Sequence, residues 1–190
     1  MKRLLKKSIE QYKKAHDSIH ENQKIMHDIR AKSKNAIALL RRENYTESRE
    51  VILEAEELFK EINRRVGRNE TPLRYGAYTE AVEEYIEALT FHNYLTGRKS
   101  GLPKFVEAGP EEVIAGISDF TGELVRKAVT SASVENLHMI VSYKKEIEYV
   151  AEELTKIGFR GKLRQKYDEV ERNLNKMENI VYDLKLKKRD

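Results

Sequence analysis

The sequence predicts an all-α protein. It contains nine glycines and three prolines in 190 residues, with 36% charged and 39% hydrophobic residues, a composition typical of proteins built from long helices. Apolar residues recur at spacings of three and four along most of the chain. No segment shows the two-residue alternation, bounded by turn residues, that marks a strand. We therefore expect a single domain over residues 1–190, formed by six to seven long helices in an elongated bundle.

The first part of the chain predicts two long helices. Neither glycine nor proline occurs before Gly67. Apolar residues at helical spacing predict a first helix over roughly 2–43 and a second that runs to about Val66, with Gly67 as its stop. Asn44 or Thr46 is the expected cap of the second helix, because both side chains can accept a hydrogen bond from its first free amides.

The middle of the chain predicts a helix followed by a loop. Thr71 and Pro72 suit the cap and the first position of a helix that is firm over 78–96. Gly97 is the expected stop, since glycine readily adopts the left-handed conformation that ends helices. The glycine-containing stretch 98–109 is expected to be a loop.

Three more helices are expected in the carboxyl-terminal part. The first covers 110–130, with proline at its start, and the second covers 134–157 with Ser133 as its cap. The last covers 162–187, where apolar residues alternate at three and four positions, the packing seam of a long helix. The seam residues are Leu163, Tyr167, Val170, Leu174, Met177, Val181 and Leu184.

Composition also limits the compartment and the class of site. The chain has no cysteine, which excludes disulfides and thiolate metal sites and favours a reducing compartment. Its basic start lacks the apolar core of a signal peptide, and no apolar run is long enough for a membrane helix. We expect a soluble, cytoplasmic protein. The net charge of +4 is small, so the distribution of charge matters more than its total.

Two acidic pairs are the candidate chemical site. Glu84 and Glu87 are three residues apart, and Asp119 and Glu123 are four apart, so each pair shares one helix face. Two packed helices with such pairs could bind a hard cation through four carboxylates, and all-oxygen ligation suits Mg²⁺ or Mn²⁺. Periodicity alone favours a plain solvated face instead, because acidic residues are abundant in this chain.

Two details favour a site over a solvated face. Phe91 and Leu95 fall on the same side of their helix as the glutamates. Gly116 and Gly122 flank Asp119, and glycines inside a helix cost stability, so they often mark a close approach of backbone or ligand. We expect the two helices to approach closely here.

These residues also carry a family resemblance. The segment Ser118–Arg126, Ser-Asp-Phe-Thr-Gly-Glu-Leu-Val-Arg, resembles the Asp-Leu-Thr-Gly-Glu-Leu-Met-Arg signature of the translin superfamily, in its translin-associated factor X (TRAX) branch. Glu84–Ala88 resembles that branch's Glu-Tyr-Val-Glu-Ala, and Val170–Lys187 is similar to its terminal helix. The ordered match covers roughly 70–187. The first 65 residues match in helical character only.

The resemblance implies a translin-like subunit that assembles into a hollow, octamer-like shell that binds RNA or DNA. In the TRAX branch the matching acidic residues form a metal-dependent endoribonuclease, whereas translin lacks them. Because this chain retains Glu84, Glu87, Asp119 and Glu123, it falls on the catalytic side. The basic start shows no nuclear-import tract, which favours a prokaryotic, archaeal homologue that forms a homo-oligomer.

The expected chemistry is metal-assisted hydrolysis of RNA phosphodiesters, single-stranded or duplex. Glu84, Glu87 and Asp119 would be the principal ligands of Mg²⁺ or Mn²⁺, and Glu123 would bind through a water or orient one. The alternatives are a non-catalytic, translin-like shell that binds single-stranded RNA or DNA, and a purely structural helical oligomer. A ferritin-like di-iron bundle needs two Glu-x-x-His motifs, and the chain has one, at Glu135–His138.

Basic and aromatic residues near the motifs are candidates for nucleic-acid binding. Arginines there would contact phosphates with little base readout. The arginines expected to do so are Arg68, Arg74, Arg98 and Arg126. The aromatic residues considered for base stacking are Tyr75, Tyr78, Tyr85 and Phe120.

Overall fold

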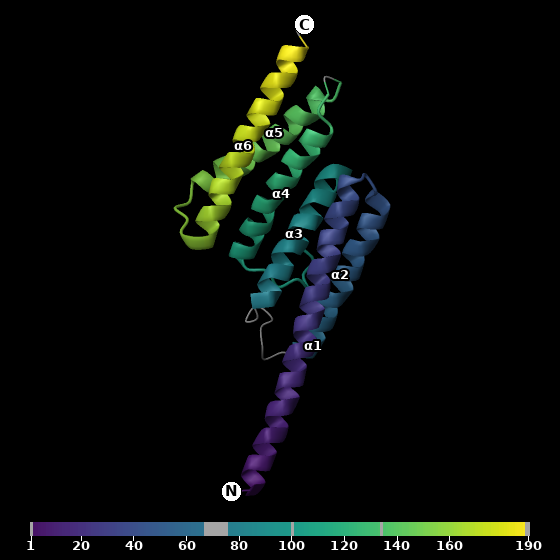
Figure 1. Ribbon diagram of the computed structural model, residues 1–190, viewed down its shortest axis with the longest axis vertical. Coiled ribbons are helices and arrows are strands. Elements are labelled where there is room, and N and C mark those ends of the chain that lie inside the picture. Colours follow the sequence, from purple (N-terminus) through teal and green to yellow (C-terminus); the bar gives the residue numbers. More distant parts are fainter. Residues whose placement is uncertain (1, 67–75, 100, 134, 189–190) are drawn as a thin grey trace.

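The structure is a computed structural model that describes residues 2–66, 76–99, 101–133 and 135–188 (Figure 1). These residues form six α-helices and no strand, which confirms the all-α prediction. The helices are α1 (Lys2–Arg41), α2 (Tyr45–Val66), α3 (Gly76–Thr96), α4 (Pro110–Thr130), α5 (Leu137–Thr155) and α6 (Gly161–Lys187). None of them is long and apolar enough to cross a membrane.

Helix α3 is the centre of an elongated bundle. It packs against α1 and α2 on one side and against α4 on the other, and α4 in turn packs against α5 and α6 (Figure 1). Its aromatic side chains Tyr78 and Tyr85 are fully buried, and both meet Phe59 of α2 edge to face, with ring centroids 5.8 and 5.0 Å apart. A helix enclosed on two sides must be apolar on both, which explains the weak amphipathic pattern of this segment.

The first half of α1 projects beyond the other helices (Figure 1). The side chains of residues 5–10 and 19–21 are exposed, and burial begins at Asn22. Helical periodicity alone predicts α1 correctly, and the described apolar side chains of its projecting part, Leu5, Ile9 and Ile19, are exposed.

The helix ends follow the predicted signals at three places. The amide of Glu47 donates to Asn44 Oδ1 at 3.4 Å, so Asn44, rather than Thr46, lies at the start of α2. Gly97 ends α3 with a φ of 67°, as expected. Helix α4 begins at Pro110. The stop at Gly67 and the start at Thr71 and Pro72 lie outside the described residues.

The predicted start of the fifth helix is wrong. Helix α5 begins at Leu137 rather than at residue 134, and it ends at Thr155. The amide of Asn136 donates to the carbonyl of Ser133 at 3.2 Å and lies 3.3 Å from its hydroxyl. The side chain of Asn136 donates to the carbonyl of Ser131 at 3.0 Å. Ser133 therefore closes a turn before the helix instead of capping it.

Helices α3 and α4 come into close contact at Gly116. A Cβ atom at Gly116 would lie 2.7 Å from the carbonyl oxygen of Glu83 and 2.7 Å from Cβ of Ile86. The predicted close approach is thus confirmed for Gly116. It is wrong for Gly122, where the nearest atom to such a Cβ is Nδ2 of Asn173, on α6, at an ordinary 3.6 Å. The contact at Gly116 sets the two acidic segments side by side.

Candidate metal and nucleic-acid site

The four predicted carboxylates converge on one pocket. Glu84 and Glu87 of α3 and Asp119 and Glu123 of α4 line a cavity of about 510 Å³ that is also bounded by α6. The remaining lining residues are Gly122, Val125, Arg126, Val129, Glu169, Asn173 and Lys176. A second pocket of about 300 Å³ adjoins it on the α1 side, where Lys34, Ile37 and Arg41 meet Glu84, Glu87 and Glu123.

Glu87 is the carboxyl on which the other three acidic charges of this pocket act. It is only 9% exposed. The pKa of its carboxyl is raised to about 8, first by burial and then by the charges of Asp119, Glu123 and Glu84, against a partial offset by Lys166. Among the described residues, no basic side chain forms an ion pair with Glu87. The charged form of Glu87 therefore has no basic side chain in direct contact to stabilise it.

Glu123 is held by Arg41 from α1. Nε of Arg41 donates to Oε2 of Glu123 at 2.6 Å, and Nη2 donates to Oε1 at 2.7 Å. This two-pronged pairing raises the pKa of Arg41, chiefly through its hydrogen bonds to Glu123. The side chain of Glu123 is 6% exposed, so its orientation is fixed both by packing and by the guanidinium.

Asp119 is paired with Lys166 from α6. Nζ of Lys166 donates to Oδ1 of Asp119, and both side chains remain partly exposed. The same helix presents Asn173, whose Nδ2 donates to Oγ1 of Thr121 at 2.9 Å. Helix α6 thus forms a third wall of the pocket, attached to α4 at two points.

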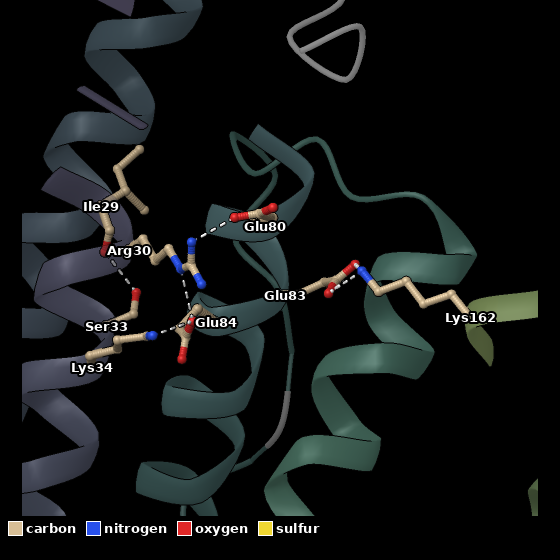
Figure 2. Close-up of polar contacts among 8 residues, drawn as sticks. All are labelled: Ile29, Arg30, Ser33, Lys34, Glu80, Glu83, Glu84 and Lys162. Carbon is tan, nitrogen blue, oxygen red and sulfur yellow. Dashed lines mark hydrogen bonds and ion pairs between the residues drawn. The ribbon is translucent and has the colours of Figure 1, made fainter. Parts of the chain in front are cut away.

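Glu84 faces α1, whereas its neighbour Glu83 faces α6 (Figure 2). Nε of Arg30 lies 3.3 Å and Nζ of Lys34 lies 3.6 Å from Oε2 of Glu84. Lys162 donates to both oxygens of Glu83 at 2.6 and 2.7 Å. Successive glutamates of α3 therefore tie it to opposite sides of the bundle, and only Glu84 enters the carboxylate pocket.

The donor set fits a hard divalent cation. All four groups are carboxylates, the ligands that Mg²⁺ and Mn²⁺ prefer, and the pKa of Glu87 is raised by burial and then by like charges that a cation would offset. In the described part of the chain, no three Asp, Glu or His side chains are gathered as a metal-binding group. Three of the four carboxylates, Glu84, Asp119 and Glu123, instead face basic side chains.

The structure describes two of the four arginines that were expected to contact phosphates, Arg98 and Arg126. Arg126 is exposed and lines the pocket, with Nε 3.9 Å from Oε1 of Glu123. Arg98 is exposed just after α3 and lines neither carboxylate pocket. Arg68 and Arg74 lie outside the described residues. Of the two predicted arginines that the structure describes, Arg126 is the one beside the acidic residues.

The base-stacking prediction is wrong for the aromatic residues that the structure describes. Tyr78, Tyr85 and Phe120 are almost completely buried. The hydroxyl of Tyr85 donates to Oε1 of Glu56 at 3.1 Å, and that of Tyr78 accepts from the amide of Glu107 at 3.2 Å. They fill the core because α3 and α4 are covered on more than one face. Tyr75 lies outside the described residues.

Sequence reasoning missed the basic and amide residues that complete the pocket. Arg41 follows Ile37 by four positions on α1, and Lys166 and Asn173 fall in line with the seam residue Val170 on α6. Asn173 also stands at helical spacing between the apolar residues Val170 and Met177, which is the signal that could have indicated it. The partners of Arg41 and Lys166 depend on how distant helices pack, which no local pattern reports.

Comparison with known proteins identifies the fold around this pocket. The sequence matches the Translin family over residues 17–188. The chain belongs to the translin family. Among its curated relatives are the proteins named Translin-associated protein X of Rattus norvegicus and Mus musculus, each 22% identical over 214 aligned residues. Both alignments cover 90% of this chain and 74% of the relative, which supports the predicted TRAX-like resemblance.

Solved structures share the same translin-like fold. A chain of apo-NeC3PO superposes with a TM-score of 0.83 at 23% identity, covering 95% of this chain and 96% of that one. A chain of the complex of AfC3PO with duplex RNA gives 0.84 at 20% identity and covers 98% of each chain. AfC3PO itself gives 0.82 at 21% identity, over 98% of this chain and 99% of that one.

Proposed function

We propose that this translin-family protein is an Mg²⁺- or Mn²⁺-dependent endoribonuclease that works within a shell of identical subunits. The observation that carries the proposal is the convergence of three carboxylates from α3 and α4 on the buried Glu87, whose pKa they help to raise to about 8. Similarity to Translin-associated protein X, and to AfC3PO in complex with duplex RNA, supports RNA as the substrate class.

The four acidic residues have different roles in this proposal. Glu84, Glu87 and Asp119 hold the divalent cation. Both oxygens of Glu123 already accept hydrogen bonds from Arg41, so Glu123 binds through a water or orients the attacking one. The cation, when bound, supplies an activated water and neutralises charge that develops on the phosphate.

RNA binding is assigned to basic residues at the rim of the pocket. Arg126 and Lys176 are exposed and line its mouth, where they can contact phosphates without reading bases. Arg98, which lines neither carboxylate pocket, stays a predicted phosphate contact, as do Arg68 and Arg74, which lie outside the described residues. Such contacts suit single-stranded or duplex RNA and also single-stranded DNA.

Exposed apolar side chains at both ends of the bundle suit subunit contacts in a homo-oligomer. Leu5 and Ile9 lie one turn apart on the projecting part of α1, and Leu5 is 60% exposed. Tyr149 of α5 and Tyr182 and Leu186 of α6 are also exposed. These surfaces support an octamer-like assembly.

The direct test is cleavage of an end-labelled RNA, single-stranded or duplex, with Mg²⁺, Mn²⁺ or a chelator. Glu84→Ala and Asp119→Ala should abolish cleavage while leaving assembly and RNA binding intact. Glu80→Ala is the matched control, because Glu80 lies on the same helix and pairs with Arg30 but does not line the pocket. Unchanged cleavage in both pocket variants would reject the assignment.

The second candidate is a non-catalytic shell that binds single-stranded RNA or DNA. The observation that favours it is the pairing of Asp119, Glu123 and Glu84 with basic side chains, which is what acids with a purely structural role would show. This candidate would be supported if the protein shifted RNA in a gel and the RNA stayed uncleaved in both Mg²⁺ and Mn²⁺. If there is no shift either, a structural oligomer is the better account.

A further inference from the structure

Two lysines on one face of α6 make matched ion pairs with different helices. Lys162 and Lys166 are four residues apart, so they lie one turn apart on the same face. Lys162 pairs with Glu83 of α3, outside the carboxylate pocket, and Lys166 pairs with Asp119 of α4, inside it (Figure 2 shows the first pair). The two pairs are alike in chemistry and differ in whether the acid belongs to the candidate site.

The pair of Lys166 with Asp119 is also unlike the pair of Arg41 with Glu123. Two nitrogens of the planar Arg41 guanidinium donate hydrogen bonds to the carboxylate of Glu123, whose side chain is 6% exposed. This geometry fixes both partners. Lys166 uses a single ammonium on a flexible stem, and the side chains are 20% and 24% exposed. A single ammonium on a flexible stem can rotate away from its partner more easily than a planar fork that makes two hydrogen bonds.

On the basis of the proposed function, we propose that Lys166 is a positioning residue that holds Asp119 in the metal-free protein and leaves it when a divalent cation binds. Lys166 and the cation require the same carboxylate in the same pocket, and its charge also acts on Glu87. In the metal-free protein, the positive charge of Lys166 therefore offsets part of the negative charge that a bound cation would offset.

The released ammonium has a second partner within reach of α6. Glu169 lies three residues after Lys166, lines the same pocket and is exposed. Its negative charge already acts on Lys166. An i,i+3 pair along α6 would therefore replace the pair with Asp119, and the exchange needs only side-chain rotation.

The test is the affinity for Mn²⁺, measured by isothermal titration calorimetry on the assembled protein without RNA. Lys166→Met removes the charge and keeps the stem, so Mn²⁺ should bind roughly fivefold to tenfold more tightly than to wild type. Lys166→Gln should do the same, which guards against misfolding of one variant. Lys166→Arg restores a cation and should return the Kd to within about twofold of wild type.

Lys162→Met is the matched control, because it breaks a similar pair on the same face of α6 without touching the four carboxylates. Its Mn²⁺ affinity should equal that of wild type. Unchanged or weaker binding by both Lys166→Met and Lys166→Gln would overturn the exchange and leave the metal site standing. If wild type bound no Mn²⁺ at millimolar concentration, both the exchange and the proposed metal site would fall.

Discussion

Arg41 holds both carboxylate oxygens of Glu123, a residue 82 positions later in the chain, at 2.6 and 2.7 Å. This contact joins α1 to α4 past the central helix α3 and fixes one wall of the carboxylate pocket. It has consequences for stability as well as for the site, because Glu123 is almost fully buried.

Arg41→Met should destabilise the protein, because it leaves a buried carboxylate without its partner. Arg41 itself is 36% exposed, and allowing for solvent screening we expect a loss of about 2 kcal/mol in the free energy of unfolding, measured by urea denaturation. Arg65→Met is the control, since Arg65 pairs with Glu21 and Glu61 on the surface and should be indistinguishable from wild type. Equal stability of the two variants would contradict a structural role for Arg41.

Gly116→Ala should separate α3 from α4. The added methyl would lie 2.7 Å from the carbonyl oxygen of Glu83 and from Cβ of Ile86, and neither the backbone nor a Cβ can rotate away. We expect a loss of about 2 kcal/mol in the free energy of unfolding, typical of an overpacked contact, measured by urea denaturation. Because the contact sets the spacing of the acidic segments, Mn²⁺ affinity should fall as well.

Gly122→Ala is the control for Gly116→Ala, since it lies in the same helix and the methyl would meet only Nδ2 of Asn173 at 3.6 Å. Alanine is favoured over glycine inside a helix by about 1 kcal/mol, so this variant should be as stable as wild type or slightly more stable. A similar loss in both variants would show that Gly116 has no special place in the packing.

The fold could be predicted from the sequence because its helices are long and their apolar periodicity is regular. Local signals also gave the start of α4 at Pro110 and the end of α3 at Gly97, where one residue decides the backbone. They failed at Ser133, whose hydroxyl faces the amide of Asn136 in a turn. A serine can serve either purpose, and tertiary packing decides between them.

The acidic half of the site could be predicted, and the basic half could not. The four carboxylates come as two short-range pairs on two helices, with a family signature to support them. Their partners Arg41 and Lys166 come from α1 and α6, and each pairing depends on which helices pack together. The burial of the α3 tyrosines could not be predicted for a related reason, because it depends on which helices cover α3.

The metal-free protein should lose stability as the pH rises, and Glu87→Gln should remove part of that loss. The folded pKa of Glu87 is about 8, against an ordinary value of 4.5. Between these values the Glu87 carboxyl is more protonated in the folded state than in the unfolded state, so its contribution to the free energy of unfolding falls with rising pH. The stabilising contribution is complete below pH 4.5 and is lost as the pH passes 8.

Urea denaturation with a chelator at pH 5 and pH 8.5 measures this difference. Glutamine keeps the shape of the side chain and cannot ionise. At pH 8.5 the free energy of unfolding of Glu87→Gln, relative to its value at pH 5, should therefore exceed that of wild type by about 2 kcal/mol or more. Glu80→Gln, on an exposed position of the same helix, should follow wild type. If the free energies of unfolding of wild type and Glu87→Gln changed with pH in parallel, folding would not raise the pKa of the Glu87 carboxyl.

Arg126→Gln should weaken RNA binding uniformly across sequences, because a rim arginine contacts phosphate and reads no base. Removing one phosphate contact should make the plot of log affinity against log salt shallower by about 0.7 for single-stranded RNA. Fluorescence anisotropy with labelled RNA over a range of salt concentrations, in chelator to prevent cleavage, gives this slope.

Arg172→Gln tests whether the effect belongs to the pocket. Arg172 is an exposed arginine of α6 that lines neither carboxylate pocket, so its removal lowers the net charge equally but should leave the slope unchanged. Net charge acts over about a Debye length and is screened in the same way for both variants. A shallower slope in both would mean that RNA responds to overall charge, and that Arg126 makes no phosphate contact of its own at the rim.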